Sequence, residues 1–288
     1  MQQTPSIAPR SMSQNIGQIE IPYVVYETEG PPLVFLHATG FLPWIWHPIA
    51  RELAPPYRVF APYFCDHRTS APEDGGLGWQ VLAEDFAGLC RALSLERPFL
   101  VGHSMGATVL ALANALFGLD ARGMVLIEPI FLPEDFYKLP ITVEQHPLAA
   151  KSIKRRNRWA DEDEAKAYLR SRSLFQEWDP EMLEIYSRYG LKAGDGGGLQ
   201  LTCSPEREAA LFMGGLQHNP WPEAAKTSCP VLVLEGEKSD NRAFIDLSQV
   251  AALFPRGSYR LIAEAGHLIP MEQPRVVMEA IRDFFNEQ

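Results

Sequence analysis

The stretch GHSMG at residues 102–106 places Ser104 between two glycines. An apolar run, FLVG, precedes the serine, and the apolar stretch MGATVL follows it. A sharp turn from a strand into a helix needs small neighbours and exposes the hydroxyl above the sheet. The turn also puts the Met105 amide at a helix amino end, where positive partial charge can stabilise an oxyanion. The pentapeptide also arises by chance, but this context predicts that Ser104 is a nucleophile.

A serine nucleophile needs a base, and His267 is the predicted one. It lies in AGHL, after the last predicted strand and before the final helix, so its loop is expected at the carboxyl edge of the sheet. His103 adjoins the serine, but the sharp turn points neighbouring side chains apart. The other histidines are His37, His47, His67, His146 and His218.

The base needs an orienting carboxylate, for which the sequence offers two candidates. Asp240 follows a predicted strand in the stretch GEKSD, and the order Ser104, Asp240, His267 is a known order of such triads. Glu128 ends the preceding strand in VLIEP and would also face the site. We favour Asp240 and keep Glu128 as the alternative acid.

A second oxyanion donor is expected from the stretch LHATG. It follows a predicted strand and opens a loop, so the Thr39 backbone amide can face Ser104 and pair with that of Met105.

Short apolar strands alternate with amphipathic helices along most of the chain, which predicts an α/β fold. Such alternation indicates a mostly parallel sheet with helices on both faces. The alternation stops in residues 130–226, which are rich in charges and aromatic rings and read as consecutive helices. We therefore expect a core at residues 19–129 and 227–288, a helical cap at residues 130–226 and a mobile tail at residues 1–18. The strands are expected at residues 21–27, 32–37, 57–62, 99–102, 123–129, 230–237 and 258–262, and the main helices at residues 44–53, 79–93, 105–117, 161–172, 246–254 and 274–285.

Composition restricts the partners of this chain of 288 residues. Its net charge of −10 argues against non-specific binding to nucleic acid or anionic membranes. The first residues lack the apolar run of a signal peptide, and no apolar run is long enough to span a membrane. The four cysteines, Cys65, Cys90, Cys203 and Cys229, form no zinc or disulfide pattern. We expect a cytoplasmic protein with a small-molecule substrate, and a homodimer stays open.

The chain resembles the α/β-hydrolase family from about residue 21 to residue 285, through LHATG, GHSMG, GEKSD and AGH. The resemblance implies an α/β-hydrolase fold with an inserted cap, a serine nucleophile and no metal or organic cofactor. It carries the nucleophile to Ser104, the acid to Asp240 and the base to His267. It carries the oxyanion donors to the amides of Met105 and Thr39.

Two departures from the family pattern stand out. Ala38 occupies a position where the family commonly has glycine, which adds bulk beside the expected oxyanion hole. The loop that usually reads Asp-x-x-Gly-x-Gly-x-Ser appears here as CDHRTSAPED, without either glycine. Family contacts near Asp66 and His67 are therefore not transferred.

Aromatic residues of the inserted segment and of the loop after LHATG predict an apolar pocket for a hydrophobic ester or lactone. Phe41, His103, Phe131 and Trp159 are the expected pocket residues. The basic run KSIKRRNRW, residues 151–159, is typical of a solvated face. If Arg155, Arg156 or Arg158 points inward, hydrolysis of a carbon–carbon bond in an acidic diketone becomes an alternative. A cofactor-free perhydrolase and a ligand-sensing member of the fold are further alternatives.

Overall fold

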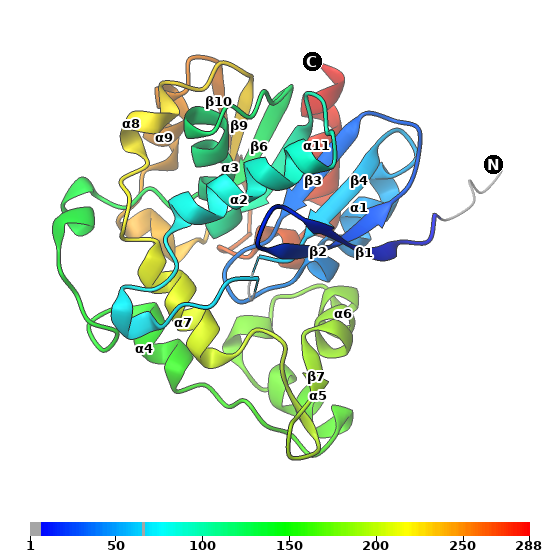
Figure 1. Cartoon of the computed structure of the whole chain (residues 1–288), viewed down its shortest axis with the longest axis vertical. Helices are drawn as coiled ribbons and strands as arrows, with labels where there is room; N and C mark the ends of the chain where they lie inside the picture. Colours follow the sequence, from blue (N-terminus) through cyan, green and yellow to red (C-terminus); the bar gives the residue numbers. More distant parts are fainter. Residues whose placement is uncertain (1–6, 65–66) are drawn as a thin grey trace.

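The computed structural model describes residues 7–64 and 67–288. Its centre is an eight-stranded sheet in the order β1-β2-β4-β3-β5-β6-β9-β10 (Figure 1). β2 is antiparallel to β1 and β4, and the strands from β4 to β10 run parallel. The sheet strands are β1 (Arg10–Asn15), β2 (Glu20–Tyr26), β3 (Pro32–Leu36), β4 (Arg58–Pro62), β5 (Phe99–His103), β6 (Gly123–Ile127), β9 (Val231–Gly236) and β10 (Gly257–Ile262).

Helices cover both faces of the sheet, which confirms the predicted α/β-hydrolase architecture. α2 (Trp79–Ala92), α3 (Met105–Leu116) and α9 (Leu247–Leu253) contribute to one hydrophobic cluster. α1 (His47–Leu53) and α11 (Pro274–Asn286) contribute to the cluster on the other face. Four strands in the middle of the sheet are fully or almost fully buried, as expected for parallel strands covered on both sides. No helix in the described residues is long and apolar enough to cross a membrane.

The strand registers bring the loops after four strands together at one edge of the sheet. Leu36 pairs with Gly102, His103 with Ile127, and Ile127 with Leu234. The carboxyl ends of β3, β5, β6 and β9 therefore lie next to one another. The loops of Thr39, Ser104, Glu128 and Asp240 begin at these ends. The loop of His267 begins at the end of the neighbouring β10, where Ile262 pairs with Gly236.

The predicted tail is wrong over part of its length. Residues 10–15 form β1, which pairs antiparallel with β2 along its whole length. Its sequence, RSMSQN, is polar and largely exposed because the strand lies at the edge of the sheet, so it lacks the apolar pattern that identifies buried strands. Residues 1–6, and Cys65 and Asp66 of the atypical loop, lie outside the described residues.

Residues 130–226, here called the inserted segment, connect β6 to β9 and lie along one end of the sheet (Figure 1). A short hairpin of β7 (Leu191–Ala193) and β8 (Leu199–Leu201) interrupts the predicted helices at the glycine-rich stretch GDGGG, residues 194–198. Asp161 caps α5 (Glu162–Arg170), accepting a hydrogen bond from the Glu164 amide at 2.9 Å. The segment comprises η3 (Glu134–Lys138), α4 (Pro147–Ile153), α5 (Glu162–Arg170), η4 (Ser173–Phe175), α6 (Pro180–Tyr189), β7 (Leu191–Ala193), β8 (Leu199–Leu201), α7 (Pro205–Gly214) and α8 (Trp221–Ala224).

Aromatic rings join the inserted segment to the loop after β3. Trp44 of η1 (Pro43–Trp46) stacks on Tyr189 with ring centroids 4.0 Å apart. Phe41 lies 5.7 Å from the Trp178 ring and 5.8 Å from the Tyr186 ring. These contacts hold the inserted segment against the sheet edge where the predicted catalytic loops begin.

Candidate active site

Ser104 occupies a strained turn between β5 and α3. Its backbone angles are φ 54° and ψ −118°, outside the regions that L residues prefer. A Cβ atom at Gly102 would lie 2.6 Å from the Ala107 nitrogen, and one at Gly106 would lie 2.3 Å from the Leu36 carbonyl oxygen. Gly102 therefore permits the tight turn from β5 into α3, and Gly106 permits the close approach of α3 to the end of β3. The motif predicts small residues at both positions.

A chain of polar contacts links three side chains from separate loops. Ser104 Oγ lies 3.1 Å from His267 Nε2, and His267 Nδ1 lies 2.9 Å from Glu128 Oε2. Ser104 is buried, Glu128 is fully buried, and the His267 side chain is 28% exposed. The imidazole can therefore take a proton from the hydroxyl on one side while the carboxylate orients it on the other.

Glu128 follows β6 in a left-handed conformation, with φ of 50°. Its Oε1 accepts a hydrogen bond from the Gly236 amide at 2.7 Å, and its Oε2 accepts one from Ser239 Oγ at 2.8 Å. A fully buried carboxylate needs such donors to offset the loss of water. The turn after β9 thus supports an acid that comes from β6.

The predicted preference for Asp240 does not agree with this geometry. Asp240 begins the 3₁₀ helix η5 (Asp240–Ala243), and its side chain is exposed. Its two neighbours point inward instead. Ser239 contacts Glu128, and Asn241 Nδ2 lies 3.0 Å from His267 Nδ1. If Nδ1 donates its proton to Glu128, the Asn241 amide must turn its oxygen toward the ring.

His103 holds the loop of His267. The His103 side chain is buried, and its Nε2 donates a hydrogen bond to the His267 carbonyl oxygen at 2.9 Å. Burial lowers the pKa of His103 to about 3, with smaller contributions from the nearby His267 and His37. The neutral imidazole therefore tethers the loop, a role that differs from the predicted contact with substrate.

The two predicted oxyanion segments are in contact. Met105 begins α3, and the close approach of Gly106 to the Leu36 and His37 carbonyl oxygens brings that helix end against the loop after β3. Thr39 lies in this loop and is 6% exposed. The arrangement is compatible with two backbone amides that face a common position near Ser104.

Two of the predicted pocket residues serve packing instead. Phe131 is fully buried, with its ring 5.8 Å from Trp221 and 6.4 Å from Phe254. Trp159 packs beside Tyr168 in a small cluster of the inserted segment. Both rings are apolar and aromatic like pocket residues, so their sequence did not distinguish the two roles. Phe41, in contrast, lies where the inserted segment meets the loop after β3.

One arginine of the basic run points inward. Arg155 Nη1 donates to Glu208 Oε2 at 2.5 Å, and its Nη2 lies 3.4 Å from Tyr186 Oη. Arg156 instead pairs with Glu164 at the surface. The inward arginine is thus already matched by a carboxylate, which leaves the pair without net charge. Arg158, also part of the run, is exposed.

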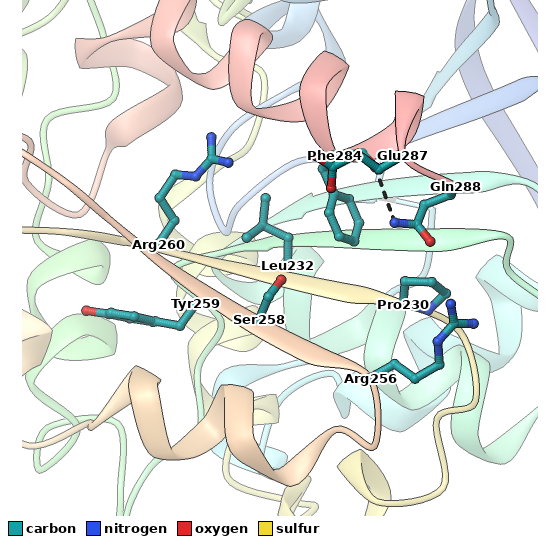
Figure 2. Close-up of a pocket in the computed structure, with 9 residues that line it drawn as sticks. All are labelled: Pro230, Leu232, Arg256, Ser258, Tyr259, Arg260, Phe284, Glu287 and Gln288. Atoms are coloured by element: carbon teal, nitrogen blue, oxygen red, sulfur yellow. Dashed lines mark hydrogen bonds between the residues drawn. The ribbon is translucent and has the colours of Figure 1, made fainter.

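A separate hollow of about 400 Å³ lies far from these loops (Figure 2). Pro230 and Arg256, which line it, precede β9 and β10, so it opens at the amino ends of these strands, opposite the edge of Ser104. Its other lining residues are Leu232, Ser258, Tyr259, Arg260, Phe284, Glu287 and Gln288. Among residues 7–64 and 67–288, no cluster of three or more metal-ligating side chains is found.

Comparisons with known proteins agree with this architecture. The model of the alpha/beta hydrolase family matches residues 33–280. The 2-(acetamidomethylene)succinate hydrolase of Mesorhizobium japonicum is 25% identical over 272 residues, which cover 94% of each chain. The uncharacterized carboxylesterase nap of Bacillus subtilis is 25% identical over 271 residues, 90% of this chain and 81% of that protein.

Solved structures show the same fold. The crystal structure of E-2-(acetamidomethylene)succinate hydrolase has a TM-score of 0.81 at 23% identity, covering 97% of this chain and all of the other. An enol-lactonase from Burkholderia xenovorans has a TM-score of 0.71 at 17% identity, covering 96% of this chain and all of the other.

Proposed function

Because the chain is an enzyme of the α/β-hydrolase family, we propose that it cleaves a carboxylic ester or lactone of a small hydrophobic substrate. We assign Ser104 as nucleophile, His267 as base and Glu128 as orienting acid. The observation that carries the proposal is the unbroken chain of contacts from Ser104 Oγ through His267 to Glu128, at 3.1 and 2.9 Å.

In the proposed reaction His267 Nε2 takes the Ser104 proton as the oxygen attacks the carbonyl carbon. Glu128 holds the ring and stabilises the imidazolium that forms. The protonated His267 then gives its proton to the leaving alcohol oxygen, and an acyl-enzyme remains. Water, deprotonated by His267, attacks this ester, and collapse of the second tetrahedral intermediate returns the proton to Ser104 and releases the acid.

The backbone amides of Met105 and Thr39 are the proposed oxyanion donors. The Met105 amide opens α3, so the helix dipole adds to its attraction for negative charge. The loop with Thr39 is held against that helix by the close approach at Gly106. Loss of one such donor costs about 3 kcal/mol of transition-state stabilisation.

The surroundings favour an apolar acyl group. Phe41, Trp178 and Tyr186 form an aromatic contact where the inserted segment, the proposed cap, meets the loop after β3. Arg155 points inward but is neutralised by Glu208. A hydrophobic substrate therefore agrees better with these residues than an anionic one.

A substrate that carries a carboxylate is the second candidate. Arg155 turns inward, the arrangement that the acidic-diketone alternative requires. The Mesorhizobium relative is named for a succinate derivative. An anionic substrate would bind in a productive position if its carboxylate displaced Glu208 from Arg155.

Turnover of matched p-nitrophenyl esters tests the proposal. The native protein should hydrolyse p-nitrophenyl hexanoate over many cycles, and Ser104→Ala should lose at least 1,000-fold in kcat. Equal activity of the two proteins would refute the assignment of Ser104. Release of about one equivalent of product would favour a ligand-sensing role.

A comparison of two acyl groups of equal length separates the substrate classes. Mono-p-nitrophenyl adipate carries a terminal carboxylate where the hexanoate ester carries a methyl group. A higher kcat/KM for the hexanoate supports the hydrophobic substrate, and a higher value for the adipate supports the anionic one. Peroxide-dependent formation of peracid would instead identify a perhydrolase.

A further inference from the structure

The Glu208 carboxylate lies against the loop that holds Thr39. A Cβ atom built on Gly40 would lie only 2.3 Å from Glu208 Oε1, so this oxygen packs directly on the Gly40 backbone. Glu208 is buried, and Gly40, with φ of 78°, immediately follows Thr39. An almost inaccessible carboxylate thus adjoins the segment proposed to donate to the oxyanion.

Negative charge at this position would oppose catalysis if nothing matched it. The tetrahedral intermediate places a full negative charge on the former carbonyl oxygen. Two like charges several ångströms apart, in partly buried surroundings, change a rate on the order of 10- to 100-fold. The loop therefore needs a nearby cation if the Glu208 carboxylate is to remain there in its charged form.

Arg155 supplies this cation. Its Nη1 donates to Glu208 Oε2 at 2.5 Å, the oxygen opposite the one that faces Gly40. Its Nη2 lies 3.4 Å from Tyr186 Oη, so α6 also borders the guanidinium. Only 23% of the Arg155 side chain and 10% of the Glu208 side chain are exposed, so solvent screens the pair less than a surface pair.

We propose that Arg155 is a positioning residue that holds Glu208 against Gly40 and cancels its charge beside the oxyanion loop. The inference rests on the proposed function, because it assumes that an oxyanion forms at this loop. The pair joins two parts of the inserted segment, the loop after α4 and α7, to the core. Packing of the inserted segment and charge neutrality of the loop then depend on the same contact.

Removing the two charges of the pair, one at a time and together, tests the proposal. The variants are Arg155→Met, Glu208→Gln and the double variant, with Arg156→Met as the control, since Arg156 pairs with Glu164 at the surface. With p-nitrophenyl hexanoate, Arg155→Met should lower kcat about 10- to 100-fold and change KM less than about threefold. The double variant should recover to within about threefold of the native kcat, because no unpaired carboxylate remains.

Two further measurements separate the effect of the unpaired charge on kcat from the effect of lost packing on stability. Added salt should raise kcat of Arg155→Met relative to native protein, because it screens the unpaired carboxylate. Thermal unfolding should show that the double variant, which also lacks the ion pair, recovers activity without recovering native stability. Glu208→Gln leaves a positive charge near the loop, so its kcat should fall far less than that of Arg155→Met.

The proposal is overturned if folded Arg155→Met keeps its native kcat, or if the double variant is as slow as Arg155→Met. If Arg155→Met does not fold, Arg155→Lys and the double variant replace it, and a tenfold loss of kcat in both would overturn the proposal. Ser104→Ala separates a failure of the proposed function from a failure of the proposed role of Arg155. Native-like activity in that variant refutes the proposed function, whereas a loss of at least 1,000-fold in Ser104→Ala beside a normal Arg155→Met refutes only the role of Arg155.

Discussion

The turns after β6 and β9 each carry an acidic residue near the carboxyl edge of the sheet, but the two residues have opposite environments. Glu128, after β6, is fully buried and contacts His267 Nδ1 at 2.9 Å. Asp240, after β9, is exposed at the start of η5. The buried side chain of the β9 turn is Ser239, which donates to Glu128 instead of supplying a carboxylate.

This difference shows that chain order alone does not select the acid. The order serine, acid, histidine holds for Ser104, Glu128 and His267 as well as for Asp240 in the middle position. What distinguishes the two carboxylates is the set of donors that each meets. Glu128 accepts hydrogen bonds from Gly236 and Ser239, which compensate its burial and aim Oε2 at the histidine.

The largest expected effect separates the two carboxylates directly. Glu128→Gln keeps the shape of the side chain but removes its charge, so the His267 imidazolium loses its stabilisation and the ring loses its preferred tautomer. We expect kcat for p-nitrophenyl hexanoate to fall about 1,000-fold or more. Asp240→Asn changes an exposed side chain in the same manner and should keep kcat within about twofold.

Steady-state kinetics of the two variants, with circular dichroism to verify folding, decides between them. The reverse ranking, in which Asp240→Asn is the slower enzyme, would mean that the β9 turn rearranges in solution and supplies the acid.

Local patterns in the sequence were sufficient for much of this arrangement. The apolar strand before GHSMG and the apolar helix after it predicted the turn at Ser104, and the glycine before His267 predicted its loop. Both depend on neighbours in the chain. The alternation of strands and helices likewise predicted the sheet, because buried parallel strands are apolar throughout.

Features that depend on distant residues were not predictable in this manner. Glu128 lies buried against His267 because Gly236 and Ser239, more than 100 residues later, donate hydrogen bonds to its oxygens. Phe131 and Trp159 differ from pocket residues only in what packs around them. The hydrophobic pattern of the sequence does not predict β1, because an exposed edge strand needs no apolar side chains.

A smaller effect is expected from the side-chain donor that the β9 turn supplies to Glu128. Ser239→Ala removes one donor from Glu128 Oε2 while the Gly236 amide still binds Oε1. The carboxylate becomes less well positioned, so kcat should fall about fivefold to tenfold. Ser248→Ala is the matched control, since Ser248 Oγ donates to the exposed Asp246 at 2.6 Å.

Rates of these two serine variants are to be measured under the same conditions as those of Glu128→Gln. An unchanged rate in Ser239→Ala would show that the backbone donor alone positions the acid.

The smallest expected effect concerns the end of β5, where His103 tethers the His267 loop whichever acid is used. Burial lowers the pKa of His103 to about 3, whereas in the unfolded chain it should be near its ordinary value of 6.5. Between these values the unfolded state binds a proton that the folded state excludes, so stability is lost as the pH falls through this range. The slope is at most about 1.4 kcal/mol per pH unit.

His103→Gln removes this titration and keeps a side-chain donor for the His267 carbonyl oxygen. At pH 7.5 the variant should be the less stable protein, by about 1 to 2 kcal/mol, because the replacement packs less well. Urea unfolding at pH 7.5 and pH 5 should show that this gap in the free energy of unfolding shrinks or reverses as the pH falls. The reason is that only the native chain must keep a histidine neutral in its folded state. A gap that stays constant would mean that His103 takes up its proton as readily in the folded protein as in the unfolded chain, so that it is protonated at pH 5. The imidazolium would then donate from both ring nitrogens, and the β5 end would carry a positive charge beside His267.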